Sequence, residues 1–423
     1  MSVARTFVIV LLGLAAGAGQ GQYLETVIPV EGWQARILLN PIANKIYASL
    51  YDINKVAIIN GATRQVIATP SVWADPQELC LNTISNKVYC RCRESNRLAI
   101  IDGVTDTIRR LIIPRGGAKS FAYNATSNRL YVGCDDGYLE VVDGVGDTIM
   151  YELRVGACLV YSMCWNPVTN YLFCATAYDS LSVLDCRTDE VRSRWNVDPF
   201  DVWCYNPANG RVYTGNSHYL WVFSPRGDSL LATISQAAQY LCAVPFPDKV
   251  YIGYGPVFVL DGSTNTIVDT IPVSSAEMVL DTVRAKAYTP YPGGSQVHVI
   301  DVRADTLFAT ISLPAFQPWA LCWNPLDGRV YVADGGRDSV YVLRDTTNGV
   351  AEASGGTSRQ AATSFCSGVY FWPGPDEGRV LDVTGRQVAK LRPGSNDLAR
   401  LPVGVYTLVG TRPAATMRLV KLR

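Results

Sequence analysis

The sequence predicts an all-β fold: a β-propeller followed by a small C-terminal β-sandwich. A phrase clearest at residues 206–213, Asn-Pro-Ala-Asn-Gly-Arg-Val-Tyr, recurs eight times. Its closing aromatic residues are Tyr47, Tyr89, Tyr131, Phe173, Tyr213, Tyr251, Tyr288 and Tyr331. They stand 37 to 43 residues apart, and the segments between them alternate like short strands. A period of about 40 residues built from four strands is typical of one propeller blade.

Each repeat divides into four strands, and the fifth repeat is the clearest case. We expect its strands at residues 202–205, 211–214, 219–223 and 229–234. Asp-Gly pairs often follow a third strand, at residues 102–103, 143–144 and 261–262. We interpret these as turns, in which Asp bonds to the backbone and Gly supplies a positive φ.

The N-terminus is expected to close the ring. Residues 23–30 resemble an outer strand such as 269–273, whereas the eighth repeat ends after its third strand, at Leu343. Pairing the two would remove both free edges. Eight blades are therefore favoured. Seven remain the alternative, because Val244 and Asp281 replace the Asn of the phrase in the sixth and seventh repeats.

The net charge and the N-terminal residues bear on the partners and the cellular location of the protein. Lys plus Arg and Asp plus Glu both total 37, so no basic excess attracts nucleic acid or anionic membranes. Residues 1–20 read as a signal peptide, with Arg5, an apolar run at 7–14 and the small-x-small site Ala16-Gly17-Ala18. That run is shorter than the roughly 20 residues of a spanning helix. We expect export through the periplasm and no transmembrane span in the mature chain.

The propeller, placed at residues 21–350, resembles the YVTN-type bacterial propeller repeats. Their phrase runs Asn-Pro-x-x-Asn-Arg-Val-Tyr-Val and then Val-x-Val-Ile-Asp, and the likeness covers about residues 23–347. The resemblance implies the fold. It implies no ligand, because the matching residues are framework.

The tail carries a second resemblance. Residues 351–365 form a Gly-, Ser-, Thr- and Ala-rich linker. Residues 366–423 then resemble the C-terminal sorting domain of the type IX secretion system. The motif residues are Asp382, Gly385, Arg386, Pro402, Gly404 and Tyr406. The resemblance implies recognition by that secretion machinery, and an Ig-like structural cap is the alternative.

Twelve cysteines in an exported chain suggest disulfides, but the repeat register argues against them. Cys80, Cys164, Cys204, Cys242 and Cys322 each precede the closing aromatic by nine residues, so they share one inner-strand position. We expect buried thiols there. Cys174 and Cys186 are the one pair considered for a disulfide. His218 and His298 fall at different repeat positions, so we predict no metal site, no catalytic triad and no cofactor.

Polar residues at the start of the inner strands mark the candidate binding site. Two residues before the cysteine position the repeats carry Arg36, Glu78, Ser120, Ser162, Val202, Tyr240, Glu277 and Ala320. Trp33, Lys119 and Trp319 lie just upstream. Aromatic and polar side chains around a concavity are typical of ligand sites. We therefore predict ligand binding at the channel mouth by Arg36, Glu78, Tyr240, Glu277, Trp33, Lys119 and Trp319. A solvated channel mouth with no ligand is the alternative.

These observations favour an exported or cell-surface binding module for a small molecule, glycan or protein. The alternative is a propeller enzyme of the lyase or quinone-dependent dehydrogenase type, with its site at the same mouth. The sequence offers no convergent acid–base set, so no catalytic residue is predicted.

Overall fold

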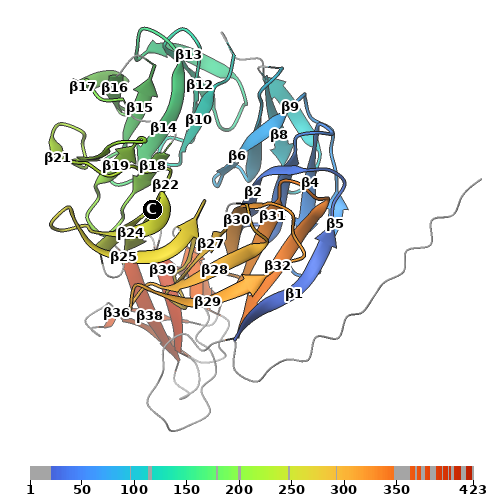
Figure 1. The fold of residues 1–423 in the computed structure, drawn as a ribbon. Coiled ribbons are helices and arrows are strands. Elements are labelled where there is room, and N and C mark those ends of the chain that lie inside the picture. Colours follow the sequence, from blue (N-terminus) through green and yellow to red (C-terminus); the bar gives the residue numbers. More distant parts are fainter. Residues whose placement is uncertain are drawn as a thin grey trace, which may run out of the picture.

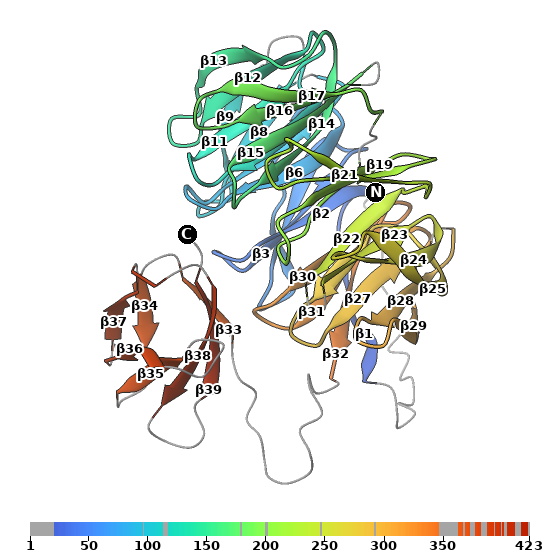
Figure 2. The same cartoon turned by 90° about the vertical axis from the view of Figure 1, so that its left-hand side faces the viewer.

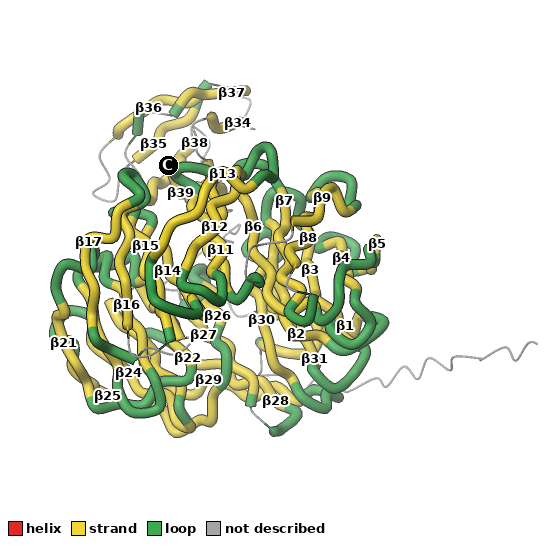
Figure 3. Tube along the Cα trace, turned by 90° about the horizontal axis from the view of Figure 1, so that it is seen from above, coloured by secondary structure: helices red, strands yellow, loops and turns green. Residues whose placement is uncertain are grey.

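The computed structural model describes residues 21–346 except 96, 113–116, 178–179, 199–201, 246–247 and 292. In the tail it describes residues 363–366, 369–372, 377–381, 387–392, 394–398, 400–401, 404–410 and 416–421. Strands and loops make up these residues, which contain no helix (Figure 3). The predicted signal peptide and most of the linker lie outside them.

Eight four-stranded antiparallel sheets form a ring of blades (Figure 1). Blades 1 and 2 consist of β2 (Gln34–Asn40), β3 (Lys45–Leu50), β4 (Lys55–Asn60), β5 (Gln65–Ala68), and β6 (Pro76–Asn82), β7 (Lys87–Cys92), β8 (Arg97–Asp102), β9 (Ile108–Ile112). Blades 3 and 4 consist of β10 (Ser120–Asn124), β11 (Arg129–Gly133), β12 (Tyr138–Asp143), β13 (Ile149–Arg154), and β14 (Val160–Asn166), β15 (Tyr171–Thr176), β16 (Ser180–Asp185), β17 (Glu190–Trp195).

The second half of the ring repeats this arrangement. Blades 5 and 6 consist of β18 (Val202–Tyr205), β19 (Val212–Gly215), β20 (Leu220–Phe223), β21 (Leu230–Ile234), and β22 (Tyr240–Pro245), β23 (Asp248–Gly253), β24 (Gly255–Asp261), β25 (Thr266–Ser275). Blades 7 and 8 consist of β26 (Val279–Asp281), β27 (Lys286–Pro290), β28 (Gln296–Asp301), β29 (Thr306–Ser312), and β30 (Pro318–Asn324), β31 (Arg329–Asp334), β32 (Ser339–Asp345), β1 (Gln22–Pro29). Eight blades are thus confirmed over seven, and the fifth repeat's predicted strands agree to within one residue.

The N-terminal strand closes the ring, as predicted. β1 pairs antiparallel with β32 from Gln22 opposite Asp345 to Pro29 opposite Ser339, and the two strands lie side by side in Figure 1. Glu25 on β1 forms ion pairs with Arg329 and Arg344. Blade 8 is therefore assembled from both ends of the propeller sequence.

The repeated phrase encodes the contact between blades. Its closing aromatic lies on the second strand and is completely or almost completely buried in every blade. Its Asn accepts hydrogen bonds from its own turn, as Asn40 Oδ1 does from Ile42 N at 3.1 Å. The Nδ2 group of Asn40 then donates to Asn86 Oδ1 of blade 2 at 2.7 Å. One side chain thus shapes a turn and joins two blades.

The seventh repeat keeps only the turn interaction of this side chain, because Asp281 replaces the Asn. Asp281 Oδ1 accepts hydrogen bonds from Val283 N and Arg284 N, but a carboxylate has no N–H group to offer the next blade. Its other oxygen pairs with the Arg284 guanidinium, 3.0 Å away. The turn survives without the Asn bond to the next blade, and Tyr288 still links blade 7 to blade 8 by donating a hydrogen bond to Asp345 Oδ2 at 3.0 Å.

The Asp-Gly turns form, but the predicted role of glycine in them is wrong. Asp102 Oδ1 accepts hydrogen bonds from the backbone N–H groups of Val104 and Thr105, as expected. Gly103 does not adopt a positive φ; that conformation falls at Asp106. A Cβ atom on Gly103 would lie 2.4 Å from Asn86 Oδ1, so glycine is required by close packing.

The tail forms a separate set of seven strands (Figure 2). One sheet has the order β33-β39-β38-β35-β36, formed by β33 (Thr363–Cys366), β39 (Thr416–Lys421), β38 (Gly404–Gly410), β35 (Gly378–Leu381) and β36 (Gln387–Leu391). The other pairs β34 (Val369–Trp372) with β37 (Gly394–Asp397). Val380, Tyr406 and Leu408 belong to its small apolar core. Of the predicted sorting residues, Gly404 begins β38 and Tyr406 is buried, whereas Asp382, Gly385, Arg386 and Pro402 lie outside the described residues.

Candidate functional site

The inner strands place eight equivalent residues at one level of the central channel. Neighbouring inner strands contact each other around the whole ring, from β2 through β6 to β30 and back to β2. The five repeat-position cysteines each face the closing aromatic of their blade, for example Cys80 opposite Tyr89. The residues two positions earlier form what we term the mouth ring: Arg36, Glu78, Ser120, Ser162, Val202, Tyr240, Glu277 and Ala320.

Three mouth-ring residues have partners within the protein, and two of them join neighbouring blades. Ser120 Oγ donates a hydrogen bond to Val160 O of the next blade at 2.8 Å. Ser162 Oγ accepts one from Trp203 Nε1 at 2.8 Å. Glu78 forms an ion pair with Arg91 of its own blade, with 3.3 Å between Oε2 and Nε. These polar groups are satisfied within the protein.

Three predicted site residues come together in the rest of the mouth ring. The positive charge of Arg36 on β2 acts on both Tyr240 on β22 and Glu277, which precedes β26. Burial raises the pKa of the Glu277 carboxyl, and Arg36 opposes that rise only in part. Burial likewise raises the pKa of Tyr240, so its hydroxyl stays protonated at neutral pH. Arg36 is exposed, and the other two side chains are half-buried.

The predicted aromatic residues Trp33 and Trp319 are partly exposed near the starts of the inner strands of blades 1 and 8. Trp33 precedes β2 and is 44% exposed, and Trp319 at the start of β30 is 37% exposed. The Trp33 ring meets Tyr51 edge-on, with 6.1 Å between ring centroids. Phe316, which the sequence analysis did not select, is 65% exposed on the loop before β30. Aromatic surface therefore borders the mouth at blades 8 and 1.

Lys119 directly precedes the inner strand β10 and has an ion-pair partner in its own blade. Its Nζ lies 3.2 Å from Asp135 Oδ2 in the same blade, and both side chains are partly exposed. Lys119 and Glu78 thus have protein partners, whereas Arg36, Tyr240 and Glu277 lie near one another.

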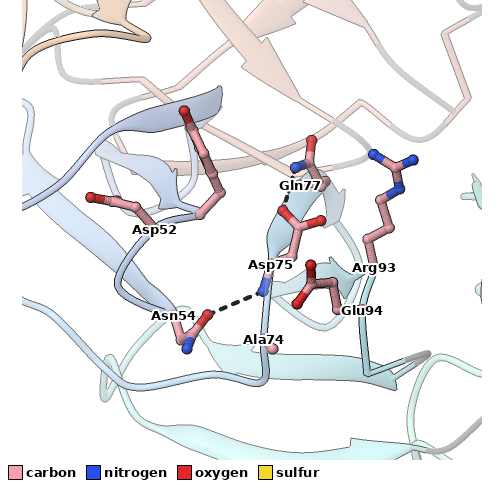
Figure 4. Close-up of a pocket in the computed structure, with 8 residues that line it drawn as sticks. Asp52, Asn54, Ala74, Asp75, Gln77, Arg93 and Glu94 are labelled. Carbon is pink, nitrogen blue, oxygen red and sulfur yellow. Dashed lines mark hydrogen bonds between the residues drawn. The ribbon is translucent and has the colours of Figure 1, made fainter.

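A polar cavity of about 490 Å³ lies between blades 1 and 2 (Figure 4). Its lining comprises Tyr51, Asp52, Asn54, Ala74, Asp75, Gln77, Arg93 and Glu94. Asn54 Oδ1 accepts a hydrogen bond from Asp75 N at 3.1 Å, and Gln77 donates to the Asp75 carboxylate. Asp52 Oδ1 accepts one from Trp33 N at 2.8 Å. None of the seven predicted residues lines the cavity, but Trp33 borders it through Tyr51 and Asp52.

This cavity arises between loops of two repeats, so the register of the inner strands does not predict it. Asp52 and Glu94 lie in equivalent loops between the second and third strands of blades 1 and 2. Comparing those loops across repeats would have found them, since blade 1 offers Tyr51-Asp52 and blade 2 offers Arg93-Glu94.

The eleven cysteines of the propeller are free thiols, including Cys174 and Cys186. Burial raises the pKa values of Cys80, Cys164 and Cys242 to about 12. Among the described residues, no three His, Cys, Asp or Glu side chains are grouped so that they could hold a metal ion. The same part of the chain has no helix long and apolar enough to cross a membrane.

Comparisons with known proteins identify the class of fold. No family model matches the sequence, and no curated protein matches it either. By structure, the chain is similar to Sqt1 of Saccharomyces cerevisiae (TM-score 0.65, 10% identity, covering 77% of this chain and 98% of that one). It is also similar to the designed protein Ika8 (TM-score 0.63, 13% identity, 77% and 100%). A third likeness is the β-propeller domain of Cps50 (Swd1) from Myceliophteria thermophila (TM-score 0.55, 10% identity, 77% and 100%).

The protein is an eight-bladed β-propeller. In all, 1752 solved chains match its structure. A likeness shared with so many chains identifies the architecture and no ligand.

Proposed function

We propose that this protein is a binding module whose ligand docks on the channel mouth at blades 6, 7, 8 and 1. The proposal is supported by Arg36, Tyr240 and Glu277, which lie at or just before the starts of three inner strands, with the charge of Arg36 acting on the other two side chains. The exposed rings of Trp33, Phe316 and Trp319 lie near the starts of the inner strands of blades 1 and 8 and add apolar contact surface. A few polar groups combined with aromatic surface in a concavity suit ligand recognition.

Binding is favoured over catalysis by the chemistry at this level. One guanidinium, one carboxyl and one phenol can orient a ligand, but they include no nucleophile paired with a base. The lyase and quinone-dependent dehydrogenase readings therefore stay alternatives, and turnover lost in a Glu277→Gln variant would favour them over binding.

Binding arrays test the proposal directly. The immobilised protein is screened against glycan and peptide arrays, beside a Trp33→Ala/Trp319→Ala variant and a Phe308→Ala control. Phe308 is exposed on outer strand β29, away from the inner strands. We expect the double variant to lose binding and the control to keep it. Equal binding by all three proteins would refute a mouth-centred site.

We further propose that the chain is exported and that its tail directs secretion to the cell surface or the medium. The signal-peptide pattern of residues 1–20 and the sorting-domain resemblance of residues 366–423 support this route. Burial of Tyr406 in the tail's core suits a folded recognition domain. Fusing residues 351–423 to a periplasmic reporter in a host with the type IX system tests it. A reporter retained in the periplasm would mean that the tail is only a cap.

A further inference from the structure

We propose that the channel mouth binds a small zwitterion, with its carboxylate on Arg36, its ammonium group on Glu277 and its apolar body against the aromatic rim. This inference rests on the proposed function, because it names the ligand class of the same site. It follows from how charge is distributed around the mouth ring.

The two charged groups are separated by the smallest member of the ring. Arg36 belongs to blade 1 and Glu277 to blade 7, and Ala320 of blade 8 stands between them. Because Ala320 ends at its Cβ atom, the ring member between them offers neither charge a hydrogen-bonding partner. No ion pair within 4 Å joins Arg36 to Glu277. A ligand carrying both charges could bridge them.

The hydrogen-bonding capacity of both groups is largely unused. Arg36 Nη1 donates to Ala35 O at 3.0 Å, which uses one of the five guanidinium N–H groups. Among the described residues, nothing donates a hydrogen bond to the Glu277 carboxyl. Glu78, at the equivalent position of blade 2, has Arg91 as its partner. Glu78 therefore has a partner within the protein, whereas the Glu277 carboxyl accepts no hydrogen bond from the described residues.

The two opposite charges disfavour ligands that carry a charge of only one sign. An anion attracted by Arg36 is repelled by Glu277, and a cation attracted by Glu277 is repelled by Arg36. A zwitterion gains from both, and a guanidinium also offers two parallel hydrogen bonds to a carboxylate. Phe316 and Trp319 lie just before and at the start of the blade 8 inner strand, and their exposed rings would supply apolar contact for the body of such a ligand.

Three matched probes test this class by calorimetry on the full chain. L-phenylalanine carries both charges, 3-phenylpropanoate lacks the ammonium group, and 2-phenylethylamine lacks the carboxylate. We expect phenylalanine to bind at least about tenfold more tightly than either, since each charge-assisted hydrogen bond is worth about 1.5–3 kcal/mol. Equal affinities, or no phenylalanine binding up to about 10 mM, would overturn the proposal.

Variants then assign each charge. Glu277→Gln should remove the preference for phenylalanine over 3-phenylpropanoate, and Arg36→Met the preference over 2-phenylethylamine. Glu78→Gln is the matched control and should leave all three affinities unchanged. Equal effects of Glu78→Gln and Glu277→Gln would contradict the assignment. If array ligands bind through Trp33 and Trp319 but phenylalanine does not bind, this ligand class fails while the proposed function stands.

Discussion

Lys87 Nζ lies 2.8 Å from Asp147 Oδ1, and this ion pair joins blade 2 to blade 3 with only 1% and 5% of the two side chains exposed. The same ammonium group donates to Gly144 O at 3.0 Å and Val145 O at 2.8 Å, so all three of its N–H groups are used. Lys45 with Asp106 and Lys249 with Asp305 repeat the arrangement between other blades. In these three blades the basic residue of the repeated phrase is thus an inter-blade contact, whereas Lys286 and Arg329 pair within their own blades.

Removing that ammonium group should be costly. Lys87→Met leaves the Asp147 carboxylate buried without a charge partner, which typically costs about 3–5 kcal/mol of unfolding free energy. Arg192→Ala breaks an exposed pair with Glu190 and should cost less than about 1 kcal/mol. Chemical denaturation measures both. Similar losses in the two variants would show that the buried pair contributes nothing special.

Deleting the N-terminal strand should open the ring. Without residues 21–30, the third strand of blade 8 loses its partner β1, and Arg329 loses Glu25. We expect the melting temperature to fall by many degrees and aggregation to rise, because two strand edges become exposed. The comparison protein lacks only residues 1–20. Identical melting curves would refute closure by β1.

The Glu277 carboxyl should make stability depend on pH. Its folded-state pKa is raised by burial, so folding favours the protonated form. That contribution is fully present below the unfolded pKa of about 4.3 and is lost as pH rises through the folded pKa. Glu277→Gln should therefore raise the melting temperature at pH 7, with a difference that shrinks toward pH 4. A difference in melting temperature that does not change with pH would show that ionisation of Glu277 is not its cause.

The thiols should be slow to react in the folded protein. Burial raises the pKa values of Cys80, Cys164 and Cys242 to about 12, so little thiolate forms at pH 8. Cys158 is half-exposed and should be alkylated first. Peptide mass spectrometry after iodoacetamide treatment, with and without denaturant, gives the order. A Cys174–Cys186 peptide pair that resists alkylation in denaturant without reductant would reveal a disulfide.

The architecture could be predicted because the sequence pattern of one blade recurs eight times. Each blade needs the same buried aromatic and the same turn, so Tyr213 and its equivalents reveal the period even where Val244 or Asp281 departs from the phrase. The role of Gly103 was not predictable in the same way. Its constraint comes from Asn86, which is distant in sequence and is brought close only by the folded blade.

The candidate site stays a prediction, but the partners of its residues can be compared with the sequence. Repeat register gives Arg36, Glu78 and Glu277 equivalent positions and does not by itself name their partners. Glu78 pairs with Arg91, which stands two residues after Tyr89, whereas blade 7 has Pro290 two residues after Tyr288. Comparing that position across repeats would have distinguished the two glutamates. The cavity beside Asp52 was not predictable from one repeat, since two blades share it.

The composite eighth blade also sets the order in which the chain can finish folding. Blades 1 to 7 are made of strands that follow one another directly, so each can form soon after it is synthesised. Glu25 must wait for Arg329, which lies 304 residues later. At about 5–20 residues per second, the first strand stays unpaired for tens of seconds. A nascent chain that stops before Asp345 would therefore be an open ring with an unpaired strand edge. Chaperones and proteases have that interval in which to bind it.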